Sequence, residues 1–116
     1  MFEYADHRAR FEDGLALARL VLDSPLAAGE PGLRALLLAQ AGWVQSRLGR
    51  YGPAEADATE ALALARPRDV DARFQALSTL GTCSWITGRL AEARRHFSQA
   101  LRLARNAGLA HESATV

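Results

Sequence analysis

The sequence predicts an all-α fold, an α-solenoid built from antiparallel helical hairpins with about five helices. Residues 42–64 and 81–103 align without a gap at a constant offset of 39 residues. An internal period of about 20–50 residues is typical of solenoids, in which each unit buries its apolar face against the next. Apolar residues recur at helical spacing in both copies, and glycine or proline separates these segments. The 116 residues are expected to form one domain.

The first predicted helix covers residues 4–22, because the residue before Pro25 is disfavoured in the helical conformation. A loop is expected over residues 27–32. The second helix covers residues 33–48, and Gly49 suits its C-terminal cap. Its apolar side consists of Leu37, Ala41, Val44 and Leu48.

The third helix is expected to open at Pro53, where a missing N–H costs nothing. The fourth starts behind Asp69 as an N-cap and ends at Gly88. The fifth is expected to stop at residues 106–108, and one side of it carries Leu90, Ala93, Phe97, Ala100, Leu101 and Ala104. The expected organisation is residues 1–30 as a half repeat or cap, 31–68 and 69–108 as two repeats, and 109–116 as a tail or the start of a further helix.

Small and buried side chains are predicted at the helix contacts. Gly42 and Gly81 fall inside helices, where each costs up to ~1 kcal/mol relative to alanine. The close approach of a neighbouring backbone is the expected compensation. Cys83 occupies the position of Val44 in the other copy, so we expect a buried structural thiol.

The repeated positions resemble the tetratricopeptide repeat family over residues 33–107. Gly49-Arg50 matches Gly88-Arg89, Ala54 matches Ala93, and Ala61-Leu62 matches Ala100-Leu101. The second copy also carries Leu80-Gly81 and Phe97, whereas the first has Ala58 in the aromatic position. The long period is similar to that of arrays in bacterial transcriptional activators and kinesin-light-chain-like adaptors. The resemblance implies a right-handed solenoid with the first helix of each hairpin on its concave side.

The resemblance places eight residues on the concave side: Ala39, Trp43, Ser46, Arg47, Ser78, Thr82, Trp85 and Ile86. The candidate partner-binding residues among them are Trp43, Arg47, Thr82, Trp85 and Ile86. Each tryptophan either anchors a partner or fills the space between hairpins. Arg47 either stacks on Trp43 and meets an acidic ligand group, or is simply solvated.

The family's clamp for a terminal carboxylate uses lysine and asparagine at concave positions. Those positions here carry Ala39, Trp43, Ser78 and Thr82. Recognition of chaperone tails is therefore disfavoured, and a more apolar or helical ligand is expected.

The charge is distributed unevenly, although the net charge of +1 argues against strong nucleic-acid binding. Residues 1–30 hold six acidic residues and three arginines, and residues 88–107 hold five arginines and one glutamate. Three interpretations stay open for the arginines, of which Arg94, Arg102 and Arg105 share a face with Arg95 beside it. They form a solvated outer face, contact an acidic or phosphate-rich partner, or stack head to tail on the acidic front of a second copy.

Catalytic and metal-binding patterns are missing from the sequence. His7, His96 and His111 are isolated, and there is no Cys-x-x-Cys pair or glycine-rich phosphate loop after a strand. No enzyme activity, metal or cofactor is expected. No apolar run approaches the ~20 residues that span a bilayer, no signal sequence is recognised, and the cytoplasm is the expected location.

The favoured hypothesis is a non-catalytic protein–protein interaction module or adaptor. It binds a peptide or helix of a partner in the concave groove or against an uncapped last hairpin. The alternative is a ligand-sensing regulatory segment of a bacterial transcriptional regulator. The sequence leaves open whether the chain is a whole protein or part of a longer array.

Overall fold

The computed structural model describes the backbone of residues 2–115 and the side chains of residues 8–108. All regular structure in this part of the chain is helical, as predicted. The helices are α1 (Phe2–Leu22), α2 (Pro25–Ala28), α3 (Pro31–Arg47), α4 (Tyr51–Leu64), α5 (Val70–Ile86) and α6 (Leu90–Thr115). The one-turn α2 overlaps the start of the loop predicted at residues 27–32 and accounts for the difference from the five helices expected, and α3 begins at Pro31, two residues earlier than predicted.

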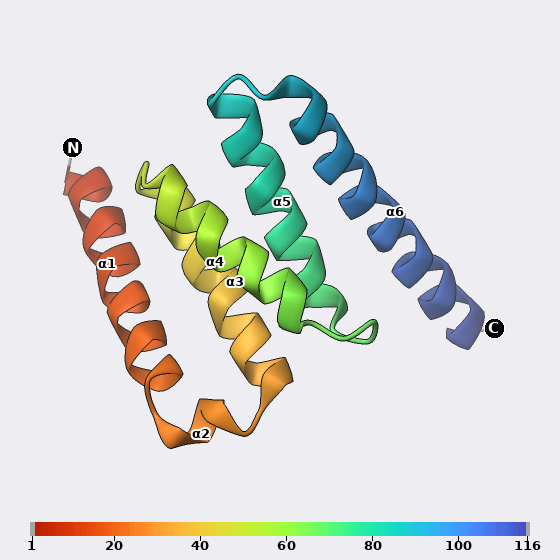
Figure 1. Ribbon diagram of the computed structural model, residues 1–116, viewed down its shortest axis with the longest axis horizontal. Coiled ribbons are helices and arrows are strands. Elements are labelled where there is room, and N and C mark those ends of the chain that lie inside the picture. The colour runs from red at the N-terminus through yellow and green to blue at the C-terminus, as the bar shows by residue number, and fades with distance from the viewer. Residues whose placement is uncertain (1, 116) are drawn as a thin grey trace.

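The long helices form two antiparallel hairpins, α3–α4 and α5–α6, with α1 on the side of the first (Figure 1). Helix α3 contacts α1, α4 and α5, so it lies at the centre of the array. Helices α1 and α6 lie at opposite edges of the molecule (Figure 1). The first helices of the two hairpins start at residues 31 and 70 and the second helices at 51 and 90, a separation of 39 residues in both cases.

Each hairpin turns through a glycine with a positive φ angle, Gly49 (81°) in the first and Gly88 (84°) in the second. In the first turn, the Gly49 N–H donates to the Ser46 carbonyl at 3.2 Å and the Arg50 N–H to the Gln45 carbonyl at 2.8 Å. The second turn repeats both bonds at the same distances. This is the Schellman arrangement, which satisfies free carbonyls at a helix end and favours glycine because it lacks a Cβ.

Alanines dominate the core between the helices, with Leu22, Leu38 and Leu80 as the larger members. The buried alanines of this cluster are Ala35, Ala39, Ala58, Ala61, Ala72 and Ala76. Such small side chains let helix backbones come close together, and the two interior glycines extend this packing. A Cβ added at Gly42 would lie 3.0 Å from the Ala54 carbonyl oxygen, which confirms the predicted backbone approach.

The structure corrects several predictions. At Gly81 the neighbour is the aromatic ring of Phe97, 2.7 Å from an added Cβ, rather than a backbone. Helix α4 begins at Tyr51, two residues before Pro53. Ala39, expected on the concave surface, is fully buried.

The predicted stop at residues 106–108 is also wrong, because α6 continues to Thr115. Gly108 lacks the positive φ angle that ends α3 and α5 at their glycines. The tail or further helix expected at residues 109–116 falls on side chains outside the described part, and the backbone there continues α6 up to Thr115.

Candidate binding groove

A groove of about 500 Å³ opens between α1 and the C-terminal ends of α3 and α5, and Tyr51 at the start of α4 also lines it. We call it the concave groove. Its lining residues are Arg8, Phe11, Ser46, Arg47, Leu48, Tyr51, Thr82 and Ile86.

The concave groove combines apolar side chains with positive charge. Phe11, Leu48 and Ile86 supply apolar surface, and Arg8 and Arg47 supply guanidinium groups. None of the described lining residues is acidic. Planar guanidinium groups bind carboxylates through paired hydrogen bonds, so the lining suits an apolar segment that also carries an acidic group.

Trp43 connects this groove to α1. Its ring meets Phe11 edge to face, with centroids 5.8 Å apart and planes at 81°. The Arg47 guanidinium carbon lies 5.9 Å from the centroid of the Trp43 ring, within the range of a cation–π contact. Trp43 therefore packs against its neighbours and holds Arg47, while it also lines a second hollow of about 280 Å³ between α1, α3 and α5.

The predicted partner-binding residues are partly brought together. Arg47, Thr82 and Ile86 line the concave groove, and Trp43 lies beside it. Trp85 is 64% exposed and lines neither hollow. The Thr82 hydroxyl donates to the Ser78 carbonyl at 2.9 Å, which leaves its oxygen as an acceptor for a ligand.

Four lining residues were missed by the sequence analysis: Arg8, Phe11, Leu48 and Tyr51. Arg8 and Phe11 come from α1, which lies outside the two matched copies. The only signal was a resemblance of residues 11–17 to residues 97–103. That resemblance indicates a related helix but not which helix it packs against.

Polar contacts, one of them to a buried carboxylate, hold α1 in place as one wall of the groove. The Asp57 carboxylate on α4, with the residue only 8% exposed, accepts hydrogen bonds from Arg19 of α1 and Gln45 of α3. Arg50 adds a second link by donating to Glu12 of α1 at 2.6 Å. Three helices are thus tied together behind the groove.

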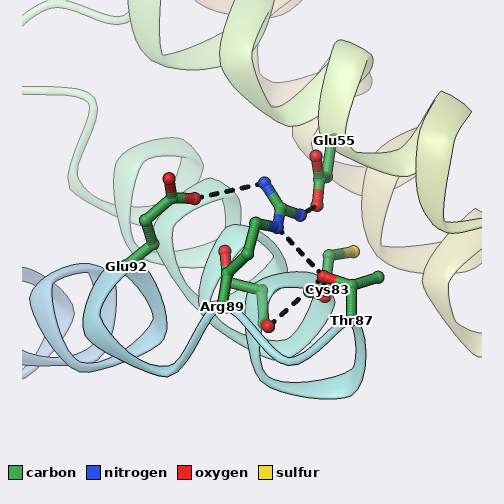
Figure 2. Close-up of polar contacts among 6 residues, drawn as sticks. Glu55, Cys83, Thr87, Arg89 and Glu92 are labelled. Atoms are coloured by element: carbon green, nitrogen blue, oxygen red, sulfur yellow. Dashed lines mark hydrogen bonds and ion pairs between the residues drawn. The ribbon is translucent and has the colours of Figure 1, made fainter.

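A second polar cluster joins the two hairpins (Figure 2). The Arg89 guanidinium lies between Glu55 of α4 and Glu92 of α6, and it pairs with both. Cys83 beneath it is fully buried, as predicted, and burial raises the pKa of its thiol to about 11. A thiol with this pKa stays protonated near neutral pH, so Cys83 lacks the thiolate that nucleophilic chemistry requires.

The other chemistry-bearing groups do not form a reactive cluster in the described part of the chain. Burial, together with the nearby Arg95 charge, lowers the pKa of His96. Among the described residues, no set of three histidine, cysteine or acidic side chains is placed to hold a metal ion. In the same part, no helix combines the length and apolar character needed to cross a membrane.

The matched hairpin turns, the close helix contacts and the open groove define an α-helical repeat protein. Residues 74–107, which cover most of the second hairpin, match the family model of the tetratricopeptide repeat. Repeats of this family generally mediate protein–protein interaction and are generally non-catalytic. No curated protein and no solved structure matches the chain.

Proposed function

We propose that this chain is a non-catalytic interaction module or adaptor that binds a peptide or helix of a partner protein in the concave groove. The observation that carries the proposal is the lining of this groove. Apolar Phe11 and Ile86 line it together with Arg47, and no described lining residue is acidic. The partner segment expected here has one or two large apolar side chains and a nearby aspartate or glutamate.

The five predicted partner-binding residues take different parts in this proposal. Arg47, held over Trp43, meets the acidic group. Thr82 accepts a hydrogen bond, and Ile86 contacts the apolar side chains. Trp85 adds an aromatic surface outside the groove for the part of a ligand that leaves it.

Selection from a random peptide display library tests this function. We expect peptides that combine an acidic residue with aromatic or aliphatic ones, with amide shifts in the NMR spectrum at residues 46–51 and 82–86. Replacing Arg47 and Ile86 by alanine is expected to weaken binding at least tenfold, a loss of about 1.4 kcal/mol. Arg68→Ala, an exposed change in the loop between α4 and α5, is the matched control and is expected to leave binding unchanged.

The proposal is contradicted if the selected peptides shift amides outside this groove. It is also contradicted if they bind the double variant as well as the original chain. Affinity capture from a lysate with the same variants then identifies the physiological partner. The cytoplasmic and bacterial setting expected from the sequence remains a prediction.

A second function, the sensing of a small ligand by a transcriptional regulator, is supported by the groove volume. About 500 Å³ falls in the range of ~300–1,000 Å³ that is typical of small-molecule sites. A library of small carboxylates, screened by the rise in Tm, tests this alternative. A ligand that raises the Tm of the original chain but not that of Arg47→Ala favours sensing over peptide binding.

A further inference from the structure

The outer surface of α1 carries an apolar pair between two acidic residues. Leu17 and Leu20 are 64% and 69% exposed. Asp13 precedes them and Asp23 follows them, both exposed. This spacing places the four side chains broadly on one side of the helix and its first following turn, because residues three and four apart are neighbours on a helix surface. We call these four residues the α1 stripe.

Helix α6 carries a similar pair of partly exposed apolar side chains between two arginines, although the ring of Phe97 also packs on Gly81 of α5. Phe97 and Leu101 are 42% and 53% exposed. Arg94 precedes them and Arg105 follows them, both exposed. Positions 94, 97, 101 and 105 fall on one side of an α-helix. These four residues form the α6 stripe.

The repeat register shows that the apolar part of the α6 stripe is a packing position. Thirty-nine residues earlier, Phe97 corresponds to Ala58 and Leu101 to Leu62. Ala58 is fully buried and Leu62 half-buried, since α4 packs against α3 of its own hairpin, where Ala58 meets Gly42, and against α5 of the second hairpin. Among the described residues, no helix packs on α6 as α5 packs on α4, so Phe97 and Leu101 stay 42% and 53% exposed even though the Phe97 ring lies against Gly81 of α5.

The two stripes complement each other in length and charge. Each extends over about 15 Å at a rise of ~1.5 Å per residue, with an apolar centre and charges near both ends. Asp13, Asp23, Arg94 and Arg105 take part in no ion pair among the described residues. Since α1 and α6 lie at opposite edges of the molecule, the stripes of one chain do not meet each other (Figure 1).

We propose that copies of this chain associate head to tail, with the α1 stripe of one copy packed on the α6 stripe of the next. The apolar pairs supply buried area and the aspartates pair with the arginines. A contact between two different surfaces either closes into a ring or continues into an open chain of subunits. This association uses surfaces separate from the concave groove, so the two proposals fail or succeed independently.

Charge reversal combined with mixing tests the proposal by sedimentation over a range of protein concentrations. The original chain is expected to exceed its monomer mass of 12.5 kDa as concentration rises. The variant Arg94→Glu/Arg105→Glu and the variant Asp13→Arg/Asp23→Arg are each expected to remain monomeric, because both stripes then carry the same sign. An equal mixture of the two variants is expected to associate again, since each acidic stripe finds a basic one.

Arg68→Glu is the matched control and is expected to associate like the original chain. Leu101→Ser tests the apolar part without a charge change and is expected to weaken association. Recovery in the mixture also shows that the reversed variants are folded, and circular dichroism checks this for each variant alone. The proposal would be overturned if the original chain stayed monomeric or if either charge-reversed variant associated alone. It would also be overturned if the mixture of the two variants failed to associate.

Discussion

Glycine and alanine set the distance between the helices of this chain. At Gly42 the neighbouring group is the backbone of α4, and at Gly81 it is the ring of Phe97. The two positions match in the repeat but differ in what fills the space above them. In the first hairpin an alanine at position 58 brings the helix backbones together, and in the second a phenylalanine ring occupies that space.

We expect Gly42→Ala to lower the free energy of unfolding by about 1 kcal/mol. Overpacking costs ~1–3 kcal/mol and the gain in helix propensity returns up to ~1 kcal/mol. The neighbouring Ala54 carbonyl is backbone and has little freedom to move. Gly14→Ala is the matched control: it lies inside α1 with nothing within 4 Å of an added Cβ, so it is expected to stabilise the chain. Urea unfolding followed by circular dichroism measures both, and a stabilising Gly42→Ala would contradict the close contact.

The buried thiol of Cys83 predicts a loss of stability at high pH. Its pKa is about 11 in the folded chain and ~8.5 in an unfolded one. Between these values the unfolded chain releases the proton first, so the free energy of unfolding falls as pH rises. Well below the pKa of the unfolded chain, the thiol is protonated in both states and this loss of stability does not occur.

Comparison with Cys83→Ala isolates this effect from that of other titrating groups. Between pH 8 and pH 11 the original chain is expected to lose about 2–3 kcal/mol of its free energy of unfolding relative to Cys83→Ala. Urea unfolding at several pH values measures the shift. A difference that stays constant with pH would show that the thiol is not shielded in the folded chain.

At the scale of elements, α1 depends on polar anchors because it packs beside the array without a partner helix from a hairpin of its own. Arg19 reaches the buried Asp57, and Arg50 reaches the exposed Glu12. The two ion pairs both join α1 to the rest of the chain, but only the first involves a buried carboxylate.

Arg19→Met is expected to destabilise the chain by about 1–2 kcal/mol, because it leaves the buried Asp57 with Gln45 as its one hydrogen-bond donor among the described residues. Arg50→Met is the control and is expected to cost under about 1 kcal/mol, as exposed ion pairs generally do. Amide exchange should rise in α1 more than in α3 in the first variant. Equal effects of the two changes would show that Asp57 does not depend on Arg19.

Local sequence signals located most of the helices but not how α1 packs. Gly49 and Gly88 marked the ends of α3 and α5 because their turns need a positive φ angle. Gly108 suggested a helix end for the same reason, but it lacks a positive φ angle and α6 continues through it. Likewise, Arg47, Thr82 and Ile86 follow from their repeat positions, whereas Phe11 reaches the groove only through long-range packing that no local pattern encodes.

At the scale of the whole molecule, the chain separates its surfaces by chemistry. The concave groove has arginines and apolar side chains, the outer side of α1 has acidic and apolar ones, and the outer side of α6 has basic and apolar ones. The net charge of +1 hides this separation. Charge order along the array, rather than total charge, is therefore the property that governs what each surface attracts.

The equal spacing of the hairpin turns has a consequence for how such a chain changes in length. Recombination that joins Gly49 directly to Arg89 deletes 39 residues and places α6 after α3 with the same turn. The ring of Phe97 then meets Gly42 in place of Gly81, so a glycine still lies beneath it. The opposite exchange adds a unit in the same register. Whole units can thus be lost or gained by a single crossover without changing the length of any remaining helix.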